Sequence, residues 1–207
     1  MDIAIRSDKY AWPTRILHGG LAGTVIIQLL SSLVMEHPRK DSPGNWFFEV
    51  HEYAGLAALF FAYSFIAHLI LRHLGTEKGL LFPWLSSRRR AALWSDITEH
   101  FRSFRALGMP PYQDHAPLPS AVQGLGLLLI AAMASTGGLF YAFASPDAPV
   151  SQIAGFSLEV HKVLSNLVWA YLIAHAGMAC VHHFTKHQRL GEMWSFRRRR
   201  SSRGENS

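Results

Sequence analysis

The fold of this chain is decided by residues 160–181, which read VHKVLSNLVWAYLIAHAGMACV. The segment is suited to a membrane-spanning helix, because such a helix needs about 20 predominantly apolar residues. His161 and His175 lie inside it, 14 residues apart. At about 3.6 residues per turn and about 1.5 Å per residue, both imidazoles face one side of the helix, roughly 21 Å apart along its axis. One helix therefore offers two stacked ligand positions, one near each membrane surface.

The composition fits a membrane protein of modest size. The chain has 207 residues, of which 49% are hydrophobic and 16% are charged. Its net charge of +6 would suit nucleic acid, but most Lys and Arg residues lie between apolar runs, so we expect no nucleic-acid partner. The single Cys180 excludes an intrachain disulfide and any Cys-x-x-Cys motif, which leaves metal chemistry to histidine.

Four apolar runs are long enough to cross a bilayer as helices. They cover roughly residues 16–35, 53–71, 121–143 and 160–181. The first run is longer than the apolar region of a typical signal peptide and lacks a small-x-small cleavage pattern, so we expect it to be retained. The prediction is an all-α, integral membrane four-helix bundle over residues 1–196, followed by a basic disordered tail at 197–207.

The orientation of the spans follows from the Lys and Arg residues beside them, because cytoplasmic loops carry an excess of both. The connections at 36–52 and 144–159 hold only Arg39 and Lys40, so they face outward. Most other basic residues lie near the two termini and in the long second loop. We therefore expect a multi-pass protein of the bacterial inner (plasma) membrane, with both termini and the second loop cytoplasmic.

The second loop is long enough to hold a helix of its own. Between residues 93 and 107 its apolar residues recur at helical spacing, whereas Glu99, Arg102 and Arg105 fall elsewhere. This pattern predicts an amphipathic helix on the inner membrane surface. An ordinary solvated connector is the alternative, since the apolar stripe spans only about four turns.

Twelve histidines are spread along the chain, and their depth decides what they can do. Those in loops or at the interface are explained by solvation alone. A polar ring in hydrocarbon is costly, however, and intramembrane ionisable residues are usually functional. Five histidines lie in or at the ends of the apolar runs: His18, His51, His68, His161 and His175.

The predicted topology sorts these histidines into pairs. His18 and His175 lie toward the cytoplasmic ends of the first and fourth spans, so they can meet in one leaflet. His51 and His161 enter their spans from the outside and form a second pair. His68 lies 17 residues after His51, about 100° out of phase. We interpret His68 as a packed or lipid-boundary histidine, and as the first substitute for His18 if that residue is not a ligand.

Pairs of imidazoles from opposing helices favour haem iron over other metals. With both axial positions filled, such an iron passes electrons rather than binding oxygen, whereas zinc would require further ligands. Two pairs predict two haem b groups. A flat macrocycle needs small residues between helices, although glycine at small-xxx-small spacing also serves helix packing alone. The candidate glycines are Gly19, Gly20, Gly23, Gly55, Gly137 and Gly138.

Several short motifs together resemble a known superfamily over nearly the whole chain. They are Leu17-His18, His51 with Gly55, Thr136-Gly137, His161-Lys162, and His175 followed by His182-His183. Their order is similar to that in the bacterial di-haem cytochrome b561 and nickel-hydrogenase-type cytochrome b membrane superfamily. This resemblance implies axial ligation of an inner haem by His18 and His175 and of an outer haem by His51 and His161.

The resemblance also bears on partners. The superfamily includes free-standing quinone-linked cytochromes and the membrane subunits of hydrogenases and formate dehydrogenases. The length of the second loop and the segment Asp114-His115-Ala116-Pro117-Leu118 look similar to hydrogenase-type subunits, although Ala116 stands where those subunits have Asn. This would imply a periplasmic redox partner.

We therefore expect a di-haem b-type cytochrome of a respiratory chain, transferring electrons across the inner membrane to or from the quinone pool. No catalytic residue pair is evident, so any catalysis would be at a quinone. Arg15 and Arg72 are candidates to pair haem propionates, or they serve only as cytoplasmic anchors of the spans. Quinone or quinol would bind near Arg15, His175 and His182, unless His182 simply reaches water. The lipid bilayer and a second copy of the chain complete the candidate partners.

Other functions remain open at this point. One alternative is a cytochrome b subunit that anchors a periplasmic dehydrogenase or hydrogenase. A histidine-lined metal-ion transporter would also bury histidines, but the broken helices and inverted repeats common in transporters are not evident. A membrane anchor without a cofactor would leave His161 and His175 without a role.

Haem stoichiometry tests the pairing of the histidines. We expect two haem groups per chain, bound non-covalently because the chain has no Cys-x-x-Cys-His motif. A pyridine haemochrome assay against protein mass measures this ratio. A ratio near one would remove one histidine pair, and a ratio of zero would end the haem interpretation.

Overall fold

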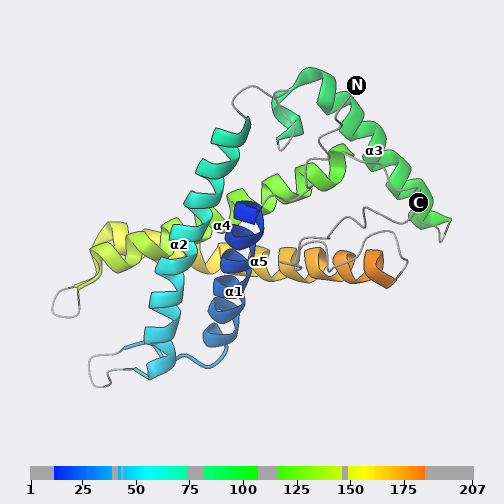
Figure 1. Ribbon diagram of the computed structural model, residues 1–207. Helices are drawn as coiled ribbons and strands as arrows, with labels where there is room; N and C mark the ends of the chain where they lie inside the picture. The colour runs from blue at the N-terminus through cyan, green and yellow to red at the C-terminus, as the bar shows by residue number, and fades with distance from the viewer. Residues whose placement is uncertain are drawn as a thin grey trace, which may run out of the picture.

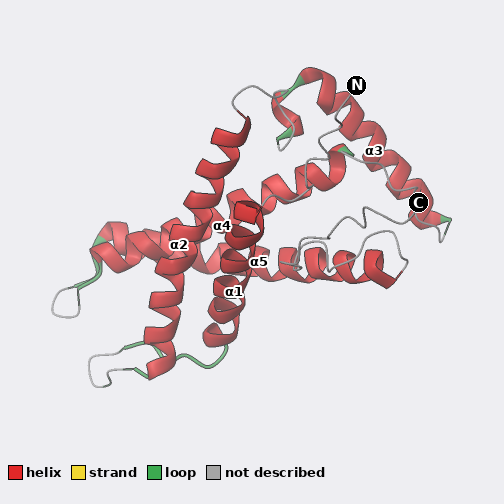
Figure 2. Ribbon diagram, viewed as in Figure 1, coloured by secondary structure: helices red, strands yellow, loops and turns green. Residues whose placement is uncertain are grey.

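The computed structural model describes residues 12–38, 42, 44–73, 82–106, 116–145 and 149–184, and these residues form no β-strand. Their regular structure is helical throughout, as Figure 2 shows, so the predicted all-α class is confirmed. The elements in chain order are α1 (Trp12–Ser32), α2 (Trp46–His73), the short 3₁₀ helix η1 (Pro83–Leu85), α3 (Ser87–Arg105), α4 (Pro117–Phe143) and α5 (Gln152–Phe184).

The helices that contain the apolar runs begin before those runs, because their first turns have their own start signals. Pro117 occupies the first position of α4, where its missing N–H costs no hydrogen bond. At the start of α5, the Ser151 hydroxyl oxygen accepts a hydrogen bond from the Ala154 N–H at 3.2 Å, as an N-cap residue does. These local signals extend α4 and α5 beyond the apolar segments that mark them in the sequence.

Three helices in the described part of the chain are long and apolar enough to cross a membrane: Trp46–Leu71, Pro117–Phe143 and Gln152–Val181. The predicted first span is absent from this set. The α1 helix carries polar residues such as Thr14, Thr24 and Gln28 along its length, and these lower its hydropathy. Three of the four predicted spans are therefore supported, and the crossing of α1 stays a prediction.

The helices are arranged as two hairpins. Within the described residues, α1 packs against α2, α4 packs against α5, and α2 joins the two hairpins by packing against α4. In Figure 1 the α1–α2 pair crosses the α4–α5 pair steeply. Helices of a regular bundle lie within about 20° of parallel or antiparallel. The described helices therefore do not confirm the regular four-helix bundle that the sequence predicts.

Small residues explain how the hairpins approach each other. Ala58 and Ala62 of α2 and Ala131 and Ala134 of α4 are all buried, and Ala62 has no exposed surface. Short side chains let helix backbones come close, which increases van der Waals contact. Larger apolar side chains from α1, α4 and α5 complete the core around Ala62: Leu21, Val25, Leu29, Leu127, Ile130 and Val168.

The α3 helix confirms that the second loop contains a helix with an apolar face. Trp94 and Phe101 are exposed, while Arg88, Arg89 and Arg90 occupy its first turn. Where α3 lies relative to a membrane stays a prediction.

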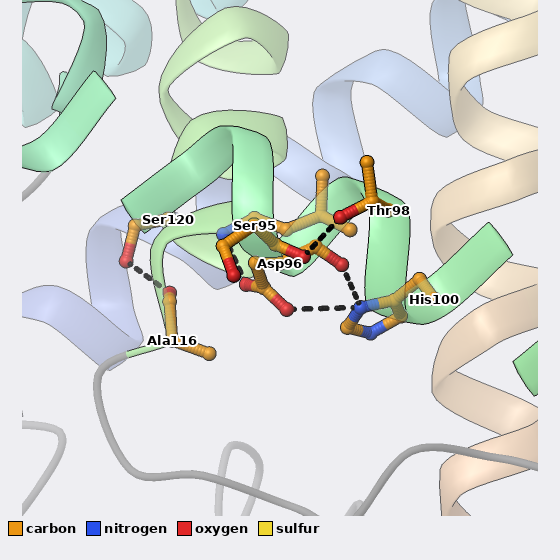
Figure 3. A network of polar contacts seen from close by, with 7 residues as sticks. Ser95, Asp96, Thr98, His100, Ala116 and Ser120 are labelled. Carbon is orange, nitrogen blue, oxygen red and sulfur yellow. Dashed lines mark hydrogen bonds and ion pairs between the residues drawn. The ribbon is translucent and has the colours of Figure 1, made fainter. Parts of the chain in front are cut away.

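A polar contact attaches α3 to the beginning of α4. The Asp96 carboxylate accepts a hydrogen bond from the Leu118 N–H at 2.9 Å, and its other oxygen lies 2.9 Å from His100 Nδ1 (Figure 3). Asp96 thereby satisfies one of the backbone N–H groups that the first turn of a helix leaves without a partner. His100, interpreted from the sequence as a solvated histidine, is instead half-buried and paired with Asp96.

A larger side chain at the crossing of the hairpins should destabilise the fold. We expect Ala62→Leu to lower the thermal unfolding midpoint in detergent, because overpacking a core costs about 1–3 kcal/mol. Ala67→Leu is the matched control, since Ala67 is an exposed residue of the same helix. Circular dichroism measures both midpoints, and equal midpoints would contradict the buried position of Ala62.

Candidate cofactor site between paired histidines

The structure brings the imidazole rings of His51 of α2 and His161 of α5 close together. Their ring centres are 6.3 Å apart and their planes are inclined at 83°. Since a metal–imidazole nitrogen bond is about 2 Å long, two imidazoles on opposite sides of one ion have their ring centres about 6 Å apart. The spacing of these two rings therefore fits two axial ligands of a single metal.

Hydrogen bonds settle which nitrogen of each ring faces the metal position. His51 Nδ1 lies 3.1 Å from the Gln28 carbonyl oxygen, and His161 Nδ1 lies 3.0 Å from the Met133 carbonyl oxygen. A carbonyl oxygen can only accept, so Nδ1 carries the proton in both rings. Nε2 is then the nitrogen that can bind a metal, which is the usual division of roles in a ligating histidine.

Two hydroxyl groups complete the surroundings of these rings. Ser31 Oγ lies 3.1 Å from His51 Nδ1, and Thr136 Oγ1 lies 3.1 Å from His161 Nδ1. Gln28 contacts His51 a second time, because its side-chain amide donates a hydrogen bond to the His51 carbonyl oxygen. Gln28 and Ser31 are not among the site residues predicted from the sequence, although a polar residue inside an apolar run is a signal that could have identified both.

A cavity of about 320 Å³ lies at this histidine pair. That volume is at the lower end of the range of about 300–1,000 Å³ for small-molecule sites. Gly55, Gly137 and Gly138 are among the residues that line it, together with both histidines. A Cβ atom at Gly137 would stand 3.1 Å from His161 Cε1, so a larger residue there would crowd the ring. These three predicted glycines therefore lie where a ligand would need space.

Other predicted glycines have different surroundings. A Cβ atom at Gly20 would collide with the Phe61 ring. Gly20 therefore serves the packing of α1 against α2, which was the alternative role considered for these glycines. A Cβ atom at Gly23 would meet nothing within 4 Å. The six glycines thus do not form one cofactor surface.

His18 of α1 and His175 of α5 lie near enough to interact electrostatically. Both are half-buried. The His175 ring stacks on Tyr171, with centres 5.4 Å apart and planes inclined at 19°, and the Tyr171 hydroxyl lies 3.5 Å from His175 Nδ1. Tyr171 was missed in the sequence, although residues four apart on a helix share a face. The second predicted pair is thus brought into the same region.

His68 has a partner on another helix. Its Nε2 lies 3.1 Å from the Thr14 hydroxyl of α1, and the ring is half-buried. This contact agrees with the prediction that His68 is packed against a neighbouring helix. It also leaves only Nδ1 of the ring without the Thr14 hydrogen bond.

The remaining predicted site residues divide into two groups. Arg15 lies in the first turn of α1 and is half-buried. The side chains of Arg72 and His182 lie outside the described residues, as does the tail at 197–207.

Within the described part of the chain, no group of three or more His, Cys, Asp or Glu residues could hold a metal ion. The donor set consists of histidine pairs, which suits a metal whose other ligands come from a macrocycle.

These features define a class of protein: a helical protein with membrane-spanning segments, in which paired histidines from opposing helices are placed to bind a metal-centred cofactor. The chain belongs to the prokaryotic cytochrome b561 family, whose model matches residues 9–196. The resemblance drawn from the sequence is thereby confirmed. Membership indicates a membrane b-type cytochrome that transfers electrons and implies haem b as its cofactor. No curated protein and no solved structure was found to match the chain.

Proposed function

We propose that this protein is a di-haem b-type cytochrome that transfers electrons across the bacterial inner membrane to or from the quinone pool. The observation that carries the proposal is the His51–His161 pair, with ring centres 6.3 Å apart. Nε2 of each ring is available to a metal because each Nδ1 is hydrogen-bonded to a backbone carbonyl. Haem, when bound, would supply the one-electron chemistry.

His51 and His161 hold the outer haem in this proposal, and His18 and His175 hold the inner one. Each pair would hold a haem iron through two imidazole nitrogens, a ligand set that favours electron transfer over oxygen chemistry. His68 is assigned no ligand role, because its Nε2, the nitrogen that faces the metal position in the outer pair, lies 3.1 Å from the Thr14 hydroxyl. His18 and His175 lie near enough to interact electrostatically, which supports the second pair.

The α1 helix is proposed as the fourth span. Its 21 residues measure about 31 Å at about 1.5 Å per residue, which matches a hydrocarbon core of about 30 Å. Its polar groups are acceptable at that depth because α2 satisfies several of them. Thr14 contacts His68, and both Gln28 and Ser31 contact His51. With four spans, both termini and α3 lie on the cytoplasmic side.

Quinone is proposed to bind in the inner leaflet. Arg15 and His175 lie on helices that reach this side, and His182 is seven residues beyond His175 on α5. A hydrogen-bond donor beside an apolar surface suits a quinone carbonyl and ring. The exposed aromatic residues Trp94 and Phe101 of α3 offer such a surface. Arg15 and Arg72 are proposed to pair the propionates of the inner haem.

Leucine substitutions test the ligand pairs. Each change removes one imidazole, so variants of the same pair should share a phenotype. We expect His51→Leu and His161→Leu to lose one haem, and His18→Leu and His175→Leu to lose the other, in reduced-minus-oxidised difference spectra. His68→Leu should keep both. If His68→Leu instead matches His175→Leu while His18→Leu has no effect, His68 is the inner ligand.

Reduction by a quinol analogue tests the quinone site. We expect His182→Ala to slow haem reduction by the quinol about tenfold, because loss of one hydrogen bond to a bound ligand costs about 1 kcal/mol or more. The matched control is His187→Ala, five residues further along the chain. Stopped-flow absorbance gives the rates. Wild-type rates and inhibitor affinity in His182→Ala would place the quinone elsewhere and leave the haem assignment intact.

A further inference from the structure

The two hairpins hold their outer histidines with the same arrangement of atoms. In α1, the Ser31 hydroxyl donates to the Gln28 carbonyl oxygen at 3.1 Å, and His51 Nδ1 approaches both oxygens at 3.1 Å. The Gln28 carbonyl oxygen and the Ser31 hydroxyl oxygen, three residues apart, therefore form one acceptor site with two oxygens on the surface of α1. We call this acceptor the α1 clamp.

The same acceptor occurs in α4 and is called the α4 clamp. The Thr136 hydroxyl donates to the Met133 carbonyl oxygen at 2.8 Å. His161 Nδ1 lies 3.0 Å from that carbonyl oxygen and 3.1 Å from the hydroxyl oxygen. In each hairpin the first helix thus carries the clamp and the second helix carries the histidine.

The direction of the hydrogen bonds gives the hydroxyl groups a specific role. Each hydroxyl uses its proton on the carbonyl of its own helix, so its oxygen presents only lone pairs to the histidine. The Nδ1–H is therefore shared between two acceptors. Other hydroxyl groups also bond to carbonyls of their own helix, as Thr24 does with Gly20 and Leu21, but no imidazole is described as approaching Thr24 Oγ1.

We infer that Ser31 and Thr136 are matched positioning residues that fix the orientation of His51 and His161 and lower the reduction potential of the outer haem. The inference rests on the proposed function. A hydrogen bond from Nδ1–H makes an imidazole a stronger electron donor toward a metal, and stronger donation favours the oxidised ion. Two acceptors also restrain rotation of the ring, which holds the two planes at their steep inclination.

The two clamps are not identical. At His51, the Gln28 side chain adds a donor to the backbone carbonyl of the histidine. Gly55 makes room for this amide, because a Cβ atom there would stand 3.0 Å from Gln28 Nε2. His161 has Met133 in the corresponding place, whose side chain offers no N–H donor. His161 therefore depends more on its hydroxyl than His51 does, and Thr136 should have the larger effect.

Redox titration of the purified holoprotein tests the inference. We expect Thr136→Val, and to a smaller extent Ser31→Ala, to raise the midpoint potential of one haem and leave the other unchanged. The low-spin ferric EPR signal of the same haem should shift, because it depends on the angle between the imidazole planes. Thr136→Ser keeps the hydroxyl and should restore both values. Thr24→Val and Ser120→Ala are the matched controls, since the hydrogen bonds that both side chains make among the described residues go to carbonyls within or at the start of their own helices.

The outcomes separate this inference from the proposed function. Loss of one haem in Thr136→Val but not in Thr136→Ser would also support it, since partners of a metal ligand commonly change affinity about 10–100-fold. An unchanged or lower potential in Thr136→Val and Ser31→Ala, with wild-type EPR signals, would overturn the inference alone. Equal effects in the two controls would overturn it as well. A wild-type protein without haem would overturn both.

Discussion

The structure depends on one constraint: an imidazole among apolar helices must have a hydrogen-bond partner for its N–H. Burying an unpaired polar group costs several kcal/mol. For His51 and His161 the partner is a backbone carbonyl of the preceding α-helix in the same hairpin, from Gln28 and Met133 respectively. Each contact fixes the rotation and depth of one helix against the next. Because the hydrogen bond is made by Nδ1, Nε2 of each ring points away from the helix that accepts the bond. Nε2 is therefore available to bind the cofactor's metal.

This constraint explains why α1 is the most polar of the four long helices that form the hairpins. Its Thr14, Gln28 and Ser31 side chains lower its hydropathy, yet each contacts a histidine of α2. An apolar α1 would insert into a membrane more readily but would leave His51 and His68 without these partners. The polarity that weakens α1 as a membrane span is therefore the polarity that supports the candidate site.

Packing and ligand space compete at the crossing of the hairpins. Ala62 and Ala131 let α2 and α4 approach closely, whereas Gly55, Gly137 and Gly138, with Ala58 and Ala134, line the cavity beside the histidines. Small residues thus serve both close packing and open space within a few helical turns. The difference lies in what faces them. Ala62 is buried in the core where the hairpins meet, whereas a Cβ atom at Gly137 would stand 3.1 Å from His161 Cε1.

The sequence by itself determined the helical class, three spans, the family and the pairing of His51 with His161, because apolar runs and histidine depth are encoded in residue spacing along one chain. Tertiary structure alone decided the steep crossing of the hairpins, the cap that Asp96 forms on α4, and the stacking of Tyr171 on His175. It also decided that Ser31 and Thr136 contact the histidines. These features depend on the rotation and crossing of helices relative to one another. A periodic pattern fixes which face of a helix is apolar but not which carbonyl or hydroxyl of a neighbouring helix that face will meet.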